Sequence, residues 1–157
     1  MADLDALLDA LDTIYAHRGT SAVVVSVDGR DGLYAEFWAD RGSEGLTADI
    51  VGNEDLPPEA QLSPEQEEAL RARGWDDATT MWRREWPSTP TRADRQRVAY
   101  ETLRVIGEVY GASGAVRVEE VILPEDAPAG PKASIVVAIA AALLALAGAL
   151  AALMSGG

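Results

Sequence analysis

The sequence has no cysteine, and this absence excludes disulfide bonds, thiolate metal sites and cysteine-based catalysis. It has one histidine, His17, which lies beside Arg18 where the first predicted helix ends. A single histidine there is typical of a favourable charge at a helix C-terminus and not of a general base. The sequence also lacks a glycine loop of the spacing that holds phosphates. We therefore expect no metal site and no cofactor.

Two sequence features come close to catalytic motifs without matching them. The stretch GASGA around Ser113 has Ala115 in place of the last glycine of a nucleophile elbow, and it follows a predicted helix instead of a strand. Acidic pairs such as Glu67–Glu68 and Asp76–Asp77 are adjacent along the chain and are not arranged to converge on a substrate. We expect no catalytic residues and no enzymatic activity.

Charge is unevenly distributed along a chain whose formal net charge is −13. Residues 1–70 carry 16 acidic and 3 basic side chains, whereas residues 71–104 carry 8 arginines and 5 acids. An acidic surface repels phosphate backbones, so we expect no nucleic-acid partner. Basic protein partners are favoured, although solubility alone would explain the same excess of acid.

The order of hydrophobic patterns in the first fifty residues predicts one helix and three strands. Apolar residues at helical spacing, with aspartates opposite them, predict an amphipathic helix that Gly19 ends. Three short strands joined by glycine-containing turns then predict an antiparallel meander. These strands are Thr20–Val27, Leu33–Asp40 and the stretch LTADIVGN.

Two further helices and two further strands complete the predicted domain. A short helix over Glu65–Arg73 follows the N-cap Ser63, and a long helix over Arg92–Tyr110 follows the capping residue Thr91. The stretches MWRREWP and AVRVEEVIL predict the last two strands. This order predicts an α+β fold, in which a mostly antiparallel sheet has its helices packed on one side.

Most of the aromatic residues fall in predicted strands or at the ends of elements. Strand alternation places Tyr34 and Trp38 on the face opposite Leu33 and Phe37. One face is expected to meet the helices, and the other needs a cover or a partner. In MWRREWP, Arg84 lies between two tryptophans on the same face, an arrangement that allows an arginine–indole ladder.

Two interpretations of these rings stay open at this point. Either they complete the domain's own core, or they form an aromatic surface that receives a peptide or a second subunit. Tryptophan, tyrosine and arginine are typical anchors of such surfaces. The candidate partner-binding residues are Tyr34, Trp38, Trp75, Trp82, Arg84 and Trp86.

A resemblance to a known family is found in the middle of the chain. It lies in the stretch VGNEDLPPEAQLSPEQEEALRARGW, which is followed by MWRREWP and by a helix that ends in EVYG. Its landmarks are Gly52, Asn53, Leu56, Pro57, Pro58, Leu62, Gly74 and Trp75. Over about residues 1–123 the chain resembles the TY-Chap domains of actinobacteria, relatives of type III secretion chaperones and of YbjN-type proteins. The resemblance implies a non-enzymatic α+β domain that binds peptides or unfolded protein segments, often as a dimer. It does not cover the C-terminal tail.

A charge-free run of 21 residues, Ser134 to Met154, follows a proline-rich linker at residues 124–133. As a helix the run would be ~31 Å long, enough to cross a hydrocarbon core of ~30 Å. It has no polar stripe of the kind that a soluble core helix shows. We therefore predict a transmembrane helix at 134–154, with a helix buried in an oligomer as the alternative. Lys132 before the run agrees with a body on the inner side.

The family resemblance implies a chaperone-like, peptide- or protein-binding domain at residues 1–123, and the charge-free run predicts that a C-terminal tail anchor holds it at a membrane. The alternative is a structural or regulatory dimerisation module that binds no client. The N-terminal stretch MADLDALLDALD is acidic and amphipathic, unlike a signal peptide. The domain is therefore expected in the cytoplasm, anchored to the inner membrane by a single span. Its expected partners are protein segments and the membrane, with a homodimer as an option.

Overall fold

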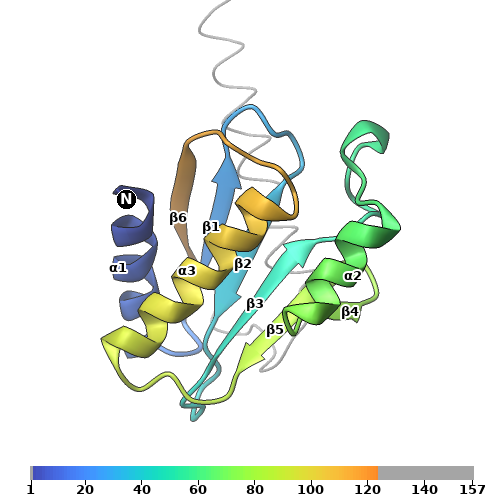
Figure 1. The fold of residues 1–157 in the computed structure, drawn as a ribbon. Helices are drawn as coiled ribbons and strands as arrows, with labels where there is room; N and C mark the ends of the chain where they lie inside the picture. The colour runs from blue at the N-terminus through green and yellow to red at the C-terminus, as the bar shows by residue number, and fades with distance from the viewer. Residues whose placement is uncertain (1, 124–157) are drawn as a thin grey trace, which may run out of the picture.

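The computed structural model describes residues 2–123, so the linker predicted at 124–133 and the hydrophobic helix predicted at 134–154 lie outside the described residues. The described chain folds into three α-helices, one short 3₁₀ helix and six strands (Figure 1). In chain order these are α1 (Ala2–Ala16), β1 (Ser21–Val27), β2 (Tyr34–Trp38), β3 (Leu46–Val51), η1 (Pro58–Ala60), α2 (Pro64–Ala72), β4 (Asp76–Ala78), β5 (Met81–Trp86), α3 (Arg92–Glu108) and β6 (Val116–Ile122).

The six strands form one sheet in the order β4-β5-β3-β2-β1-β6, and every pair of neighbours is antiparallel. This arrangement confirms the predicted α+β fold with an antiparallel sheet. The predicted meander is the central part, β1-β2-β3. The chain then adds β5 beside β3 and finally returns to place β6 beside β1. The short strand β4 was not predicted.

Local signals in the sequence fix the starts of the two later helices. Ser63 and Gln66 form a complete capping box at the start of α2, with Pro64 at its first position. Thr91 and Asp94 form a second box at the start of α3. Both predicted helix starts are confirmed to within one residue.

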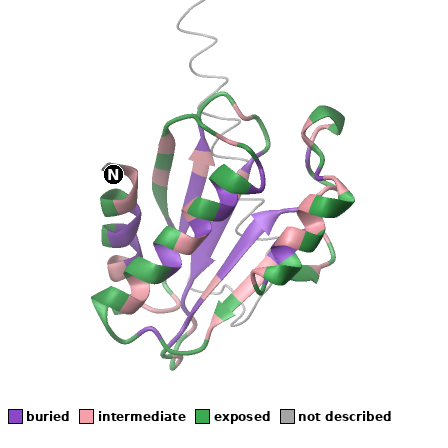
Figure 2. Cartoon of the chain, in the orientation of Figure 1, coloured by how far each residue is buried: buried purple, intermediate pink, exposed green. Residues whose placement is uncertain are grey.

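The hydrophobic core lies between one face of the sheet and the helices, which Figure 1 shows in front of the strands. We call this face the front face, and its residues include Val23, Val25, Ala35, Phe37, Ala48 and Ile50. Leu7, Leu11 and Ile14 of α1 and Val98, Ala99 and Ile106 of α3 complete this core. Burial is concentrated in the central strands and on the inner sides of the helices (Figure 2).

Candidate binding surfaces

Five of the six candidate partner-binding residues lie in strands, and the register of the sheet divides these five between its two faces. Trp82 pairs with Ile50 and Arg84 pairs with Ala48, so β5 presents these two residues on the front face. Trp86, two residues further on, shares that face. Tyr34 and Trp38 point to the opposite face, as the alternation of β2 predicted. The sequence pattern gave the face within each strand, and the register relates the strands to one another.

The front-face candidates pack within the domain. Trp75 and Trp82 are 1% and 3% exposed, and the rings of Trp75 and Trp86 meet edge to face at 6.0 Å. Arg84 lies 4.8 Å over the Trp86 ring and forms an ion pair of 2.8 Å with Glu101 of α3. These contacts join β5 to the helices. A role for these four residues in binding a partner stays a prediction.

The arginine–indole arrangement on β5 differs in its partners from the ladder that the sequence suggested. Arg84 stacks on Trp86 alone, whereas the Trp82 ring is approached by Arg71 of α2 at 5.1 Å. The two tryptophans of β5 are therefore each paired with a different arginine. Only the pairing of Arg84 with Trp86 follows from strand alternation.

We define the rear face of the sheet by Val24, Tyr34, Glu36, Trp38, Asp49, Met81, Arg83 and Val121. The strand pairings place these residues on the side away from the front-face core. Val24 and Val121 form a small hydrophobic cluster there, and Tyr34 packs against both this cluster and the main core. Tyr34 donates a weak hydrogen bond of 3.8 Å from Oη to Sδ of Met81. The rear face therefore combines apolar, aromatic and charged side chains.

A continuous row of residues crosses the rear face from β6 to β5. Glu119, Val24, Glu36, Asp49 and Arg83 are successive cross-strand partners. Arg83 donates two hydrogen bonds to the fully buried Asp49 carboxylate, of 2.8 and 2.7 Å. Its guanidinium also lies 5.3 Å over the Trp38 ring. The bidentate ion pair neutralises Asp49 and raises the pKa of Arg83. Of the two acids in the middle of the row, only Glu36 therefore has no cation beside it.

Glu36 is the unusual member of this row. Its side chain is 0% exposed, and neither carboxylate oxygen has a hydrogen-bond partner in the part of the chain that the structure describes. Burial, together with the charge of Asp49, raises the pKa of Glu36 to about 8. Burial, aided by Glu36, also raises the pKa of Tyr34 well above its ordinary value. The protonated form of Glu36 therefore predominates at neutral pH.

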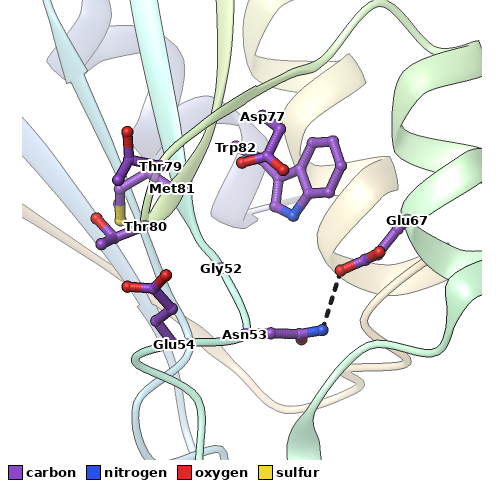
Figure 3. Close-up of a pocket in the computed structure, with 9 residues that line it drawn as sticks. All are labelled: Gly52, Asn53, Glu54, Glu67, Asp77, Thr79, Thr80, Met81 and Trp82. Carbon is purple, nitrogen blue, oxygen red and sulfur yellow. Dashed lines mark hydrogen bonds between the residues drawn. The ribbon is translucent and has the colours of Figure 1, made fainter.

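A small cavity of ≈ 170 Å³ lies where the end of β3 meets the β4–β5 turn and α2 (Figure 3). Its lining residues are Gly52, Asn53, Glu54, Glu67, Asp77, Thr79, Thr80, Met81 and Trp82. Asn53 donates to Glu67 and to the Leu62 carbonyl, each at 3.0 Å, and accepts from the Leu62 amide. Asn53 thus anchors the loop before α2, which gives a structural reason for this landmark residue.

The arrangement of titratable groups offers no metal centre within residues 2–123. Searched over those residues, no group of three or more histidine, aspartate or glutamate side chains is placed to hold an ion. The acidic pair Asp76–Asp77 lies in the exposed strand β4, and Glu67 is engaged by Asn53. What the described surfaces can do chemically is bind through aromatic, apolar and acidic groups.

Sequence reasoning missed Glu36, Asp49 and Arg83 as members of one surface. Their faces within each strand follow from alternation, because Glu36 lies between Tyr34 and Trp38 and Arg83 lies between Met81 and Glu85. The missing information is the pairing of β3 with both β2 and β5, which places Asp49 between the other two. An acid between two aromatic residues of a strand was the available signal.

A membrane span is not found in the described residues, where no helix combines the length and apolar character that crossing a bilayer requires. The span predicted at 134–154 lies outside those residues.

Comparison with known proteins agrees with the resemblance seen in the sequence. Residues 2–118 match the TY-Chap3 family model, which is described as "T3SS (YopN, CesT) and YbjN peptide-binding chaperone 3". No curated protein and no solved structure matches the chain. The C-terminal run Ser134 to Met154 lies outside the matched residues. Because the match covers most of the chain, this protein belongs to the TY-Chap3 family of T3SS- and YbjN-type peptide-binding chaperones.

Proposed function

We propose that this chaperone domain binds segments of other proteins through the rear face of its sheet. The observation that carries the proposal is the composition of that face, where Tyr34 and Trp38 flank the buried Glu36 carboxyl. The three α-helices pack on the front face, so no helix within residues 2–123 covers the rear face (Figure 1). The binding is non-catalytic, in keeping with the family description.

The charges of the domain favour segments that are apolar and also carry basic residues. The formal net charge of the chain is −13, which speeds the encounter with cationic partners. On the rear face itself Glu119 is exposed at the edge of the row, where its carboxylate can meet a basic side chain. Aromatic rings supply contact area at low entropic cost. We therefore expect apolar–basic peptides to bind better than apolar–acidic peptides of equal length.

Trp38→Ala and Trp86→Ala test the proposal in the full-length chain, because the two tryptophans lie on opposite faces. The probe is a set of fluorescein-labelled 13-residue peptides of apolar–basic and apolar–acidic composition. Fluorescence anisotropy should show an affinity at least tenfold lower for Trp38→Ala and a change of less than twofold for Trp86→Ala. Thermal melting followed by circular dichroism checks that both variants fold.

Thr47→Arg provides a second rear-face variant in case Trp38→Ala loses its fold. Thr47 pairs with Trp38 and is only half-buried, so the arginine adds bulk and charge beside the same ring. A loss of affinity in Trp86→Ala alone would move the binding surface to the front face. Absence of binding by any peptide, together with a stable dimer in sedimentation, would favour the alternative of a dimerisation module.

We also propose that Ser134 to Met154 attaches the domain to a membrane, with the domain on the cytoplasmic side of the inner membrane. The support is the charge-free run of 21 residues, preceded by Lys132 and a proline-rich linker at 124–133. In this arrangement residues 1–123 form the binding domain, and the run holds that domain at the membrane.

A further inference from the structure

We propose that the small cavity beside α2 binds the free N-terminus of a partner protein segment. This site lies apart from the rear face and goes beyond the proposed function, because it recognises the charged end of a chain instead of an apolar stretch. The cavity measures ≈ 170 Å³ and lies where the end of β3 meets the β4–β5 turn and α2 (Figure 3). It has the volume of about five water molecules, which is enough for the end of a chain.

The charge of the lining is the first argument. Three of the nine residues that line the cavity are acidic, and none of the nine is basic. The three acids come from different parts of the chain, since Glu54 follows β3, Glu67 lies in α2 and Asp77 lies in β4. Glu67 accepts a hydrogen bond from Asn53, whereas Glu54 and Asp77 form no ion pair within residues 2–123. A cavity with this lining attracts a cation.

The indole N–H of Trp82 is the second argument, and it does not depend on the acids. Trp82 is 3% exposed and packs in the main core, with Arg71 over its ring at 5.1 Å. Figure 3 shows its nitrogen turned toward Asn53 and Glu67, into the cavity. This N–H donates to no atom of residues 2–123, yet the protein does not enclose it. A donor in this position needs an acceptor oxygen on the occupant.

These two arguments together select one kind of ligand. The lysine and arginine side chains are cations, but they have no hydrogen-bond acceptor for the indole N–H. The asparagine and glutamine amides have donors and an acceptor, but they carry no charge. The N-terminus of a chain has a cationic ammonium group and a carbonyl oxygen in the same residue. The ammonium group would meet the carboxylates while the carbonyl accepts from Trp82, a form of N-terminal amine capture.

A divalent metal ion fits the cavity less well than a chain end does. Such an ion needs several oxygen ligands that converge on one point. Within residues 2–123 no group of three or more histidine, aspartate or glutamate side chains is placed to hold an ion. Carboxylates that surround a cavity without converging suit a ligand of several atoms.

Peptides that differ only at their N-terminus test the proposal in the full-length chain. The probes are 13-residue apolar–basic peptides with fluorescein at the C-terminus and an N-terminus that is either free or acetylated. Acetylation removes the terminal charge. Fluorescence anisotropy should therefore show at least fivefold tighter binding of the free form. A third peptide, acetylated but with an added lysine at its second position, restores the net charge and should bind as weakly as the acetylated form.

Asp77→Asn and Trp82→Phe place the effect at the cavity. Asp77→Asn removes a carboxylate charge, and Trp82→Phe removes the N–H while an aromatic ring remains. Each should lower the affinity ratio of free to acetylated peptide at least twofold. Asp76→Asn is the matched control, because Asp76 is exposed on the same strand but does not line the cavity. Circular dichroism checks the fold, and Asp77→Asn alone decides the test if Trp82→Phe does not fold.

Three outcomes would overturn the proposal. The first is equal affinity of the free and acetylated peptides for the wild type, or no binding of either. The second is tight binding of the acetylated lysine peptide, because a side-chain ammonium group would then be sufficient. The third is an affinity ratio that Asp77→Asn and Trp82→Phe leave unchanged, which would move the N-terminus to another surface.

Trp38→Ala separates this inference from the proposed function. If the rear face binds the apolar stretch, Trp38→Ala weakens the binding of all three peptides and leaves the ratio of free to acetylated peptide unchanged. A ratio that persists while Trp38→Ala has no effect on affinity would keep the cavity site and remove the rear-face site. Weaker binding by Trp38→Ala without any effect of acetylation would do the reverse.

Discussion

Glu36 and Asp49 are neighbouring carboxylates on one row of the sheet, yet their surroundings differ. Asp49 accepts two hydrogen bonds from Arg83, whereas Glu36 has a pKa raised to about 8 by burial and by the charge of Asp49. Arg83 is therefore paired with only one of the two buried acids, Asp49, and the unpaired Glu36 keeps its proton instead. The Glu36 side chain can therefore donate a hydrogen bond at neutral pH, whereas above pH 8 it is a buried charge.

Stability should fall with rising pH because of Glu36. Below its ordinary pKa of 4.5 the carboxyl is protonated in both the folded and the unfolded chain. Between that value and about 8, the unfolded chain has released the proton while the folded chain retains it, so unfolding becomes more favourable as the pH rises. Urea denaturation should show a loss of about 2 kcal/mol in the free energy of unfolding between pH 6 and pH 8.

Glu36→Gln should remove this pH dependence, because the amide does not titrate. Glu85→Gln changes an exposed carboxylate on the same side of the sheet and serves as the matched control, with the wild-type slope retained. The carboxylates whose pKa values are lowered, such as Asp94 and Glu108, lose their stabilising effect only as the pH falls below this window. Parallel curves for Glu36→Gln and the wild type would contradict the assignment.

The elements of the fold show what local sequence patterns can and cannot predict. Eight helices and strands follow from periodicity and capping signals, including the capping boxes at Ser63 and Thr91. The strand β4 was missed because its three residues, Asp76–Ala78, have neither apolar alternation nor β-branched side chains. Its pairing with β5 is the product of a tight turn at Thr79 and Thr80.

The candidate site was predicted only in part, for a reason that also lies at the level of elements. Alternation separated Tyr34 and Trp38 from Phe37 within β2, and the structure agrees. It could not relate β2 to β5, because their common neighbour β3 sets which residues of the two strands share a face. The tryptophans therefore appeared as one set in the sequence and lie on two faces in the structure.

Two glycines at the ends of elements should respond in opposite ways to alanine. A Cβ on Gly107, in the last turn of α3, would meet only the Ala112 carbonyl oxygen at 3.8 Å, so Gly107→Ala should stabilise the domain by roughly 0.5–1 kcal/mol. A Cβ on Gly52, just after β3, would lie 2.5 Å from the Thr80 carbonyl oxygen, a backbone atom that cannot move aside freely. Gly52→Ala should therefore destabilise by roughly 1–3 kcal/mol.

Chemical denaturation of the two variants measures both effects under one condition. A shift in the denaturation midpoint of the same sign for both variants would show that helix propensity and backbone spacing do not govern these sites. The slope of the transition should stay unchanged, since neither substitution alters the surface exposed on unfolding.

At the scale of the whole molecule, the proposed membrane attachment rests on the run at 134–154 and is tested in the full-length chain. Leu144→Arg places a charge near the middle of the run, at a cost of about 2.5–3.5 kcal/mol for insertion. The wild type should sediment with membranes and resist carbonate extraction, whereas Leu144→Arg should become extractable. Leu144→Ile is the matched control. Equal extraction of all three proteins would remove the anchor.

The orientation of the attached domain is tested in bacterial cells that produce the full-length chain. Protease added to intact spheroplasts should leave residues 1–123 uncut if the domain faces the cytoplasm, and it should cleave them only after lysis. Cleavage before lysis would place the domain on the other side of the membrane.

The position of β6 beside β1 has a consequence for the chain during its synthesis. Translation delivers the N-terminal segments first, so β1 with its run SAVVVSV emerges long before Val116–Ile122 is available to pair with it. Until then one edge of β1 has unpaired backbone groups, and a valine-rich edge without charge or proline is prone to pair with other chains. Until β6 has formed, a nascent copy of this chaperone therefore exposes an unpaired strand edge that other chains can bind. The pairing of β6 with β1 covers that edge.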